Sequence, residues 1–428
     1  MKEYIFRFLK NSRIQNSMWM VLEKGVAFFG LIFVVSAVAK YLGPEVYGYL
    51  ALAASVFSIV NVVARLGLDQ VYFKTASKNQ KNNNTLLKNM TNMISLIYFP
   101  LSFIVLVIFY FRIESSYFIF FIATAIANYF SAIDMRSIHF NAILMSRLNV
   151  VANTIGLLVS LAVRYLIVNF QLHIQWLCIP IIIVTLLPYL LRLYIDHKKN
   201  IFERTYSYNT KIFRKYRTYF LAVGIPLVIS MLSVSIYLQS ANFFLAALTG
   251  SHAVGIYAVG SMLAGAWYFI PTTIVISFLS LVYKTNSEKD YLEKAGLILR
   301  YLLLVTLSII VILYFLSEYI ILWLYGNAFK ESILVFKILL FSYFFSVIGF
   351  YFYRLVMKFG GYNFLAKKMT ITCVLNIILS YFLIKSYGVI GAAYAALITE
   401  FVSNMIFNLF YKNILMPKVV FKALGGKV

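Results

Sequence analysis

Charged side chains are scarce in this sequence, and acidic side chains most of all. Asp, Glu, Lys and Arg make up 12% of the 428 residues, with only 14 Asp and Glu, whereas hydrophobic residues make up 62%. A water-soluble particle of this mass needs far more polar surface, so the composition excludes a soluble enzyme. The mean hydropathy of +0.85 places the chain in a lipid bilayer, which about 20 apolar residues cross as a helix.

Cysteine is almost absent, and histidine is rare. Cys178 and Cys373 lie inside apolar runs, far apart and without the spacing of metal ligands. The four histidines are isolated from one another along the chain. We therefore expect no metal site and no cofactor.

Long apolar runs, bounded by charges and by Gly, Pro or Asn, predict twelve membrane-spanning helices. These runs lie at residues 15–40, 45–66, 90–111, 117–137, 149–169, 174–195, 218–248, 253–282, 295–317, 331–357, 368–385 and 388–411. The fold class we expect is therefore an all-α integral membrane protein with about twelve transmembrane helices.

Positive charge is abundant, with 38 Lys and Arg and a net charge of +24. When the loops are assigned alternately to the two sides of the membrane, nearly all basic residues outside the spans fall on the side of the N-terminus. The opposite side receives only Lys40, Arg112, Lys330 and Lys385. Because cytoplasmic loops carry the excess of Lys and Arg, both termini are predicted to be cytoplasmic, and the charge requires no nucleic acid partner.

The sequence also indicates two halves. The longest polar stretch lies near the centre, so we expect an N-terminal six-helix lobe at 1–196, a basic cytoplasmic linker at 197–217, a C-terminal six-helix lobe at 218–411 and a basic cytoplasmic tail at 412–428. The segment from Gly43 to Ala51 parallels the segment from Gly250 to Ala258, 207 residues later. Such a repeat favours parallel lobes related by an axis along the membrane normal, although chance similarity of apolar segments is the alternative.

Glu400 is the best placed ionisable residue inside a predicted span. Asn404 follows it on the same helical face, one turn later. A buried acid in a bilayer needs a partner or a wet cavity, so Glu400 is a candidate site for a coupling proton or cation. The alternative is a structural hydrogen bond to a neighbouring helix.

Further polar residues inside the spans could line a shared cavity, or they could hold helices together or reach the membrane surface. The candidate cations for substrate binding are Lys24, Arg65 and Arg164, and Glu23 is a second candidate acid. The candidate polar lining comprises Asn61, Asn128, Asn153, Ser160, Asn376 and Asn404. Gly224 and Pro226 interrupt the start of the seventh span and are the predicted hinge, with a static kink as the alternative.

Four short motifs resemble the polysaccharide transporter family, the Wzx-type O-antigen flippases of the superfamily that also contains the MATE multidrug exporters. They are Tyr41-Leu-Gly-Pro-Glu-Val-Tyr-Gly48, Val254-Gly-Ile-Tyr-Ala258, Leu324-Tyr-Gly-Asn-Ala-Phe329 and the segment from Tyr387 to Glu400. The resemblance extends from Asn16 to about Lys412, and its motifs specify the superfamily better than the substrate.

The resemblance implies two six-helix lobes around a central, MATE-like cavity in the bacterial inner membrane. It also implies that a lipid-linked oligosaccharide, carried on undecaprenyl diphosphate, moves from the cytoplasmic to the periplasmic leaflet by alternating access. Membrane lipids, a polysaccharide polymerase and a chain-length regulator are the implied partners. Family members often carry an acid in the seventh span, where this chain has Ala241 and Asn242, so ion coupling is left to Glu400 or Glu23.

Two other functions remain open. A MATE-like multidrug exporter is the first, although its cationic substrates would favour an acidic cavity. A membrane-embedded polysaccharide polymerase is the second, but such an enzyme would be expected to carry catalytic residues in a long outer loop, which the predicted spans do not leave.

Overall fold

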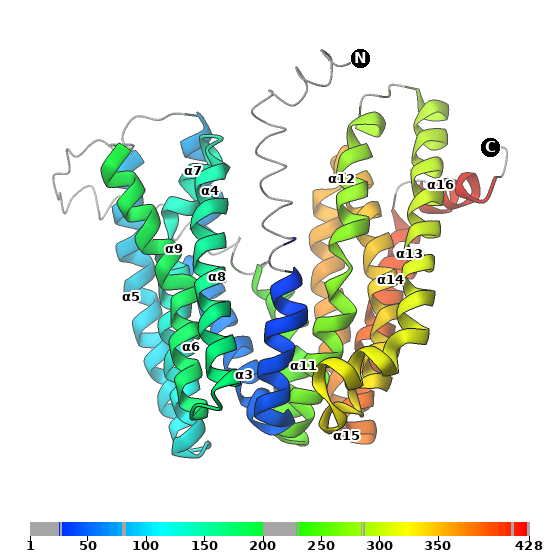
Figure 1. Cartoon of the computed structure of the whole chain (residues 1–428). Coiled ribbons are helices and arrows are strands. Elements are labelled where there is room, and N and C mark those ends of the chain that lie inside the picture. Colours follow the sequence, from blue (N-terminus) through cyan, green and yellow to red (C-terminus); the bar gives the residue numbers. More distant parts are fainter. Residues whose placement is uncertain are drawn as a thin grey trace, which may run out of the picture. The chain divides into compact units, whose positions relative to one another are not determined.

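Long apolar helices dominate the structure (Figure 1). The structure is a computed structural model that describes residue 25 and residues 28–78, 83–199, 228, 231–283, 285, 287–411 and 415–425. Within these residues there is no β-strand. A bilayer offers the backbone no hydrogen-bonding partners, and helices satisfy their backbone groups internally, so this all-α architecture is the expected one.

Ten helices of the described residues are long and apolar enough to cross a membrane. They are Phe28–Arg65, Leu86–Tyr110, Ser115–Ala142, Ser146–Asn169, Ile174–Lys199, Met231–Leu248, Ser251–Tyr283, Lys289–Tyr325, Ser332–Lys358 and Tyr362–Phe410. Two of them bend at a glycine with positive φ, namely Gly43 at φ 73° and Gly388 at φ 56°. Each bent helix corresponds to two of the predicted spans, although the first of them, 15–40, lies partly outside the described residues. The ten helices therefore match the twelve predicted spans, and the predicted all-α membrane fold is confirmed.

The first of two compact units contains the chain up to Leu42 and Ala53–Ser235. Its elements are η1 (Leu31–Val35), α3 (Ser36–Arg65) apart from residues 43–52, α4 (Leu68–Lys78), α5 (Asn83–Tyr110), α6 (Ser115–Ile133), α7 (Met135–Ala142), α8 (Ser146–Asn169), η2 (Ile174–Leu177) and α9 (Cys178–Lys199). Helix α9 packs along both α6 and α8, and α4 packs on α7.

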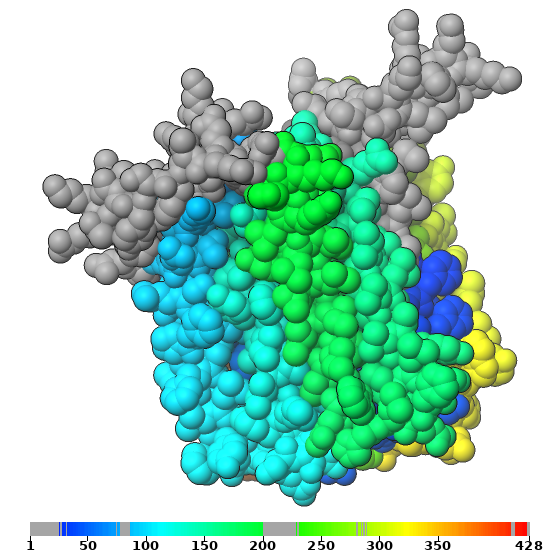
Figure 2. Space-filling model, turned by 60° about the vertical axis from the view of Figure 1, so that its left-hand side comes forward, coloured from blue at the N-terminus to red at the C-terminus, as the bar shows by residue number. Residues whose placement is uncertain are grey.

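The face of this unit formed by helices α5 to α9 carries many exposed apolar side chains. Figure 2 presents the face on which helices from α5 to α9, coloured from blue and cyan to green, are exposed. The exposed side chains of α5 and α9 include Phe99, Phe103, Leu190 and Tyr194. Large apolar side chains exposed in such number indicate contact with lipid.

The second compact unit contains Gly43–Leu52 and Ile236–Val428. Its elements include the helix Met231–Leu248 from Ile236 onward, α11 (Ser251–Ala266), α12 (Phe269–Tyr283), α13 (Glu288–Tyr325), η3 (Asn327–Phe329), α14 (Ser332–Lys358), α15 (Tyr362–Phe401), η4 (Val402–Ile406), η5 (Phe407–Phe410) and α16 (Leu415–Ala423). Helix α14 is central, because it packs against α11, α13 and α15.

The two copies of the sequence repeat lie against each other inside the second unit. A Cβ atom on Gly48 would overlap the carbonyl oxygen of Ser251 and lie 3.0 Å from the amide nitrogen of Gly255. A Cβ atom on Gly255 would likewise overlap the carbonyl oxygen of Pro44 and lie 3.1 Å from the amide nitrogen of Gly48. Each glycine therefore allows the other's backbone to approach, as small residues do between membrane helices.

The predicted linker lies largely outside the described residues. Residues 197–199 form the last turn of α9, and residues 415–423 of the predicted tail form α16. The proposed boundaries of the two lobes therefore stay predictions.

Candidate functional site

Asp134 organises the polar centre of the first unit. It follows the last residue of α6 with non-helical backbone angles, φ −77° and ψ 63°, and it is the N-cap of α7. One carboxylate oxygen accepts a hydrogen bond from the amide of Ser137 at 3.3 Å, which satisfies a donor that the first turn of α7 leaves free. The cap thus fixes the carboxylate at the break between the two helices.

Arg192 of α9 joins this carboxylate to helix α8. Its Nη1 donates to Asp134 Oδ2, its Nε donates to Asn149 Oδ1 at 2.9 Å, and its Nη2 donates to Asn153 Oδ1. The side chain of Arg192 is only 4% exposed, and that of Asp134 is 9% exposed. All three guanidinium nitrogens are used, so Arg192 connects three helices and stabilises the unit.

Replacing Arg192 by Met is expected to destabilise the protein by about 3–5 kcal/mol, because the change leaves Asp134 buried without its ion pair. Thermal unfolding of the purified protein measures the loss. The matched control is Arg112→Met, which removes an exposed arginine and should leave the unfolding temperature unchanged. Equal stability of the two variants would contradict this assignment.

Arg65 is a second arginine at this centre, and fewer of its hydrogen-bond donors have an acceptor among the described residues. It lies in the last turn of α3, directly before Leu66, whose backbone is left-handed at φ 49° and ends the helix. Its Nη2 donates to the carbonyl oxygen of Ser131. Its Nε is buried and has no hydrogen-bond partner among the described residues. A cationic donor therefore remains available for an anionic oxygen.

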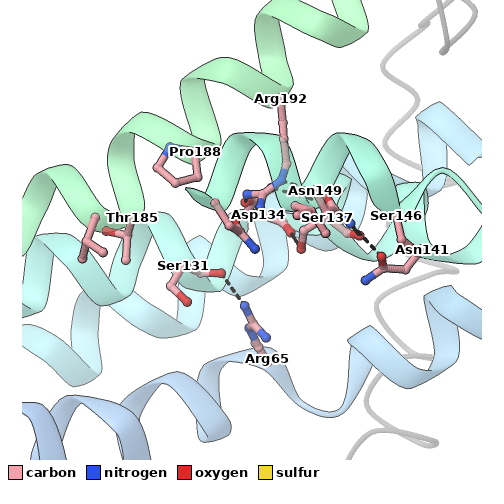
Figure 3. A pocket seen from close by; sticks show the side chains of 13 residues that line it. Arg65, Ser131, Asp134, Ser137, Asn141, Ser146, Asn149, Thr185, Pro188 and Arg192 are labelled. Atoms are coloured by element: carbon pink, nitrogen blue, oxygen red, sulfur yellow. Dashed lines mark hydrogen bonds and ion pairs between the residues drawn. The ribbon is translucent and has the colours of Figure 1, made fainter. Parts of the chain in front are cut away.

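These residues line a cavity of 270 Å³ in the first unit. In Figure 3, Arg65 approaches Ser131 from one helix, while Arg192 reaches Asp134 and Asn149 from another. The remaining polar lining includes Asn141, Asn153 and Thr185. The cavity is thus walled by two guanidinium groups, one carboxylate and several amides, a set that suits an anionic or highly hydroxylated group.

An ion pair and a buried hydrogen bond hold the helices next to this cavity together. Arg136 Nε donates to Asp196 Oδ2 at 2.9 Å, and the hydroxyl of Tyr72 lies 3.0 Å from His139 Nδ1. Burial raises the pKa of Tyr72 far above its ordinary value, so its hydroxyl stays neutral. These contacts fasten α7 to α9 and to α4.

The second unit contains its own polar centre around Glu400. The hydroxyl of Tyr237 donates to Glu400 Oε1, and the amide of Asn404 donates to Oε2 at 2.5 Å. Glu400 lines a cavity of 110 Å³ together with Tyr257, Tyr343 and Asn376. The carboxylate at the C-terminal end of α15 thus accepts hydrogen bonds from Tyr237 and Asn404 and borders a small cavity.

Asn376 belongs to a neutral cluster in the wall of the same cavity. It accepts a hydrogen bond from the hydroxyl of Ser240 and donates to Thr399 Oγ1 at 3.2 Å. Ala241 also lines the cavity. This wall therefore presents hydroxyl and amide groups, and Glu400 is the carboxylate among the described residues of the cavity lining.

The structure brings together some of the predicted site residues. Arg65 and Asn153 share the cavity of the first unit, and Glu400 and Asn376 share the cavity of the second, with Asn404 bonded to Glu400. The other described site residues lie outside both cavity linings. Asn61 donates to the carbonyl oxygen of Asn128 at 3.1 Å, and Asn128 donates to the carbonyl oxygen of Thr124. Ser160 donates to the carbonyl oxygen of Pro180, and Arg164 is half-buried on α8. Lys24, Glu23, Gly224 and Pro226 lie outside the described residues.

Two residues that the sequence reasoning missed are Arg192 and Lys368. Neither is among the predicted site residues, yet their side chains are buried in helices, where they are 3% and 4% exposed. A signal was present for each. Arg192 lies one turn from Asp196, and Lys368 lies one turn before the polar series Thr372, Asn376 and Ser380. Following each polar helical face to the end of its apolar run would have found both.

Comparison with known proteins identifies the family. Residues 14–282 match the family described as polysaccharide biosynthesis protein. A capsular polysaccharide biosynthesis protein, CapF of Staphylococcus aureus, is 23% identical over 262 residues, which are 60% of this chain and 65% of that relative. The chain thus spans less than two thirds of the length of this curated relative.

Solved structures agree on the fold. The lipid II flippase MurJ, in an inward closed conformation, superposes with a TM-score of 0.72 at 17% identity, covering 96% of this chain and 90% of that one. A MATE family multidrug resistance transporter, in an inward-facing conformation, has a TM-score of 0.58 at 13% identity, covering 92% of this chain and 94% of that one. A MATE transporter of Vibrio cholerae has a TM-score of 0.58 at 11% identity, covering 95% of this chain and 100% of that one.

These neighbours are transporters and flippases, not enzymes, and the predicted MATE-like fold is confirmed. The match over residues 14–282 covers more than half of the chain. The chain therefore belongs to the polysaccharide biosynthesis protein family and is a multi-pass membrane protein of the MurJ and MATE transporter fold.

Proposed function

We propose that this protein is a flippase for an oligosaccharide linked to undecaprenyl diphosphate, such as an O-antigen repeat unit or a similar one. It acts in the bacterial cytoplasmic membrane, with both termini in the cytoplasm, and moves the head group from the cytoplasmic to the outer leaflet by alternating access. The observation that carries the proposal is the cavity of the first unit, in which the buried Nε of Arg65 has no hydrogen-bond partner in the part of the chain that the structure describes.

The chemistry of this cavity supports a diphosphate or sugar as its occupant. Guanidinium groups bind phosphate oxygens through strong, charge-assisted hydrogen bonds, and the amides of Asn141 and Asn153 suit hydroxyl groups. The volume of 270 Å³ is below the roughly 300–1,000 Å³ of pockets for drug-sized ligands. The cavity would therefore hold one part of the head group, while the prenyl chain stays in lipid.

Lys24 and Arg164 are further candidate contacts for the anionic head group. Lys24 lies outside the described residues, and Arg164 is half-buried on α8. As contacts for the head group, both rank below Arg65, because Arg65 lies in the wall of a polar cavity.

Glu400 is the proposed coupling residue, at which a proton or cation would bind and be released during the transport cycle. Its position in the wall of a cavity supports this role, since an ion must reach it. A drug exporter is the alternative function, but the described residues that line the cavity of the first unit include two arginines and one acid, which disfavours cationic drugs.

Purified protein in vesicles tests the proposal. The probe is an undecaprenyl-diphosphate-linked oligosaccharide with a fluorescent label on its sugar, and a membrane-impermeant reductant reports the leaflet that holds the label. Wild-type vesicles should equilibrate the probe across the bilayer faster than vesicles without protein, and an imposed pH gradient should change this rate. Glu400→Gln should lose the response to the gradient.

A labelled lipid that lacks the diphosphate and the sugar is the matched control and should not be moved faster. If the protein fails to accelerate the oligosaccharide probe, or moves both lipids equally, the flippase proposal is wrong. If transport occurs but Glu400→Gln responds to the gradient like the wild type, only the coupling role is wrong.

A further inference from the structure

Lys368 is a buried ammonium group without a carboxylate in direct contact among the described residues. Its side chain lies on α15, and the residue is 4% exposed. Its Nζ donates to two amide oxygens, Asn404 Oδ1 at 3.1 Å and Asn408 Oδ1 at 3.0 Å. A charge taken out of water into a protein interior needs compensation beyond neutral dipoles, so the balancing negative charge has to be found nearby.

Asn404 supplies the connection to that charge. Its Oδ1 accepts from Lys368, and its Nδ2 donates to Glu400 Oε2 at 2.5 Å. The reversed amide would turn its nitrogen to the ammonium and its oxygen to the carboxylate, and both contacts would then be repulsive. The orientation that satisfies both neighbours therefore aligns the amide dipole between the two charges.

The local backbone is shaped to hold this amide in place. Asn404 lies in η4 (Val402–Ile406), a short π-helical stretch, and such stretches are frequent at functional sites. On the facing helix α14, a Cβ atom on Gly349 would overlap the Asn404 side chain. The space beside the glycine is thus filled by the bridging amide, and Asn408 donates to the Asn404 carbonyl oxygen at 2.9 Å.

The groups that face Glu400 are otherwise neutral. Hydroxyl groups approach from the helix Met231–Leu248 and from α14, and further phenolic groups lie around the cavity. The residues that carry these hydroxyl and phenolic groups are Tyr237, Ser346, Tyr257, Tyr268 and Tyr343. Among the charged groups that act on Glu400 within the described residues, Lys368 is the cation.

We infer that Lys368 is the internal counter-ion of Glu400 and that Asn404 transmits the attraction between them. Lys368 is a positioning residue, because it acts on Glu400 through the amide. A proton or cation that binds at Glu400 must then compete with this tethered ammonium, and its entry weakens the hold on Asn404. The consequence for transport rests on the proposed coupling role of Glu400, whereas the charge pair itself does not.

A double-mutant cycle in the full-length protein tests the pair. Lys368→Met and Glu400→Gln each leave one buried charge uncompensated, so each should lower the unfolding temperature by roughly 5 °C or more. The double variant K368M/E400Q contains neither charge and should recover at least half of the combined loss. Losses that simply add would overturn the inference.

The pH profile separates this role from a merely structural one. In Lys368→Met the carboxylate is uncompensated, and protonation removes its charge. The deficit relative to the wild type should therefore be smaller at about pH 5.5 than at about pH 8. A deficit that is independent of pH would show that Lys368 contributes only packing, which contradicts the proposal.

Lys358 provides the matched control. Its ammonium donates to the carbonyl oxygens of Val282 at 2.7 Å and Thr285 at 3.2 Å, and it has no link to Glu400 in the contacts of the described residues. Lys358→Met combined with Glu400→Gln should therefore give additive losses. A rescue as large as that of K368M/E400Q would overturn the specific pairing.

Abundance in the membrane keeps the test decisive if a single variant cannot be purified. With a fluorescent protein fused to the chain, each single variant should be less abundant and the double variant should be restored. Absence of rescue contradicts the pair. If the double variant is restored and still transports with a normal response to the gradient, the pair stands and the coupling role of Glu400 fails.

Discussion

Replacing Arg65 by alanine is expected to lower flipping of the lipid-linked oligosaccharide at least roughly tenfold while the protein stays in the membrane. A hydrogen bond to a charged group contributes about 1.5–3 kcal/mol, and about 1.4 kcal/mol corresponds to a tenfold change in binding. Arg65 makes one hydrogen bond within the described residues, to the Ser131 carbonyl, so the fold should lose little. The initial rate in vesicles and the amount of surface polysaccharide in cells measure the effect.

Arg65→Lys sharpens this prediction. Lysine keeps the charge but cannot bind a phosphate with two parallel hydrogen bonds, so flipping should recover only in part. Arg112→Ala is the control, because it removes an exposed arginine from the loop between α5 and α6 and should leave flipping unchanged. Normal flipping by Arg65→Ala would exclude Arg65 from the substrate site.

Replacing Gly48 or Gly255 by valine is expected to prevent most of the protein from folding. Either Cβ atom would overlap a backbone carbonyl oxygen of the other repeat copy, that of Ser251 or Pro44, and neither can move without shifting a helix. Overpacking of side chains alone costs about 1–3 kcal/mol, so overlap with the backbone should cost about 3 kcal/mol or more. Membrane abundance of a fluorescent fusion, followed by thermal unfolding of any purified protein, measures this loss.

Gly25 offers the matched control for these two changes. A Cβ atom on Gly25 meets no atom of the described residues within 4 Å, and its backbone is not in the positive-φ region. Gly25→Val should therefore leave abundance unchanged. Similar abundance of all three valine variants would refute the close contact between the repeat copies.

The membrane fold could be predicted from the sequence because the length of an apolar run is set by the thickness of the bilayer. The breaks between spans follow from the sequence in the same way, because apolar runs end and begin again on the two sides of Gly43 and of Gly388. The sequence did not predict that the chain turns at each break through a single glycine with positive φ and without a loop. Whether a glycine takes positive φ depends on what packs around it, which a single sequence does not contain.

The candidate sites could be predicted only in part, for a related reason. Glu400 was found because an ionisable residue in an apolar run is conspicuous, and Arg65 because it follows Asn61 on the same helical face, one turn later. Lys368 and Arg192 were overlooked because they lie where a run begins or ends, and charges at such positions usually reach water. Their burial depends on partners distant in sequence: Asn404 lies 36 residues from Lys368, and Asp134 lies 58 residues from Arg192. The same helical spacing also marks packing residues, such as Ser160, whose hydroxyl donates to Pro180.

The contact between Gly48 and Gly255 has a consequence for the origin of the chain. Two copies of one motif touch each other through equivalent residues, as the two subunits of a symmetric dimer do. This is the contact expected if a half-length ancestor paired with itself before its gene was duplicated and joined. Natural relatives should then vary the two motifs in concert, and a larger residue at one glycine position should occur only with a compensating change in the opposite motif.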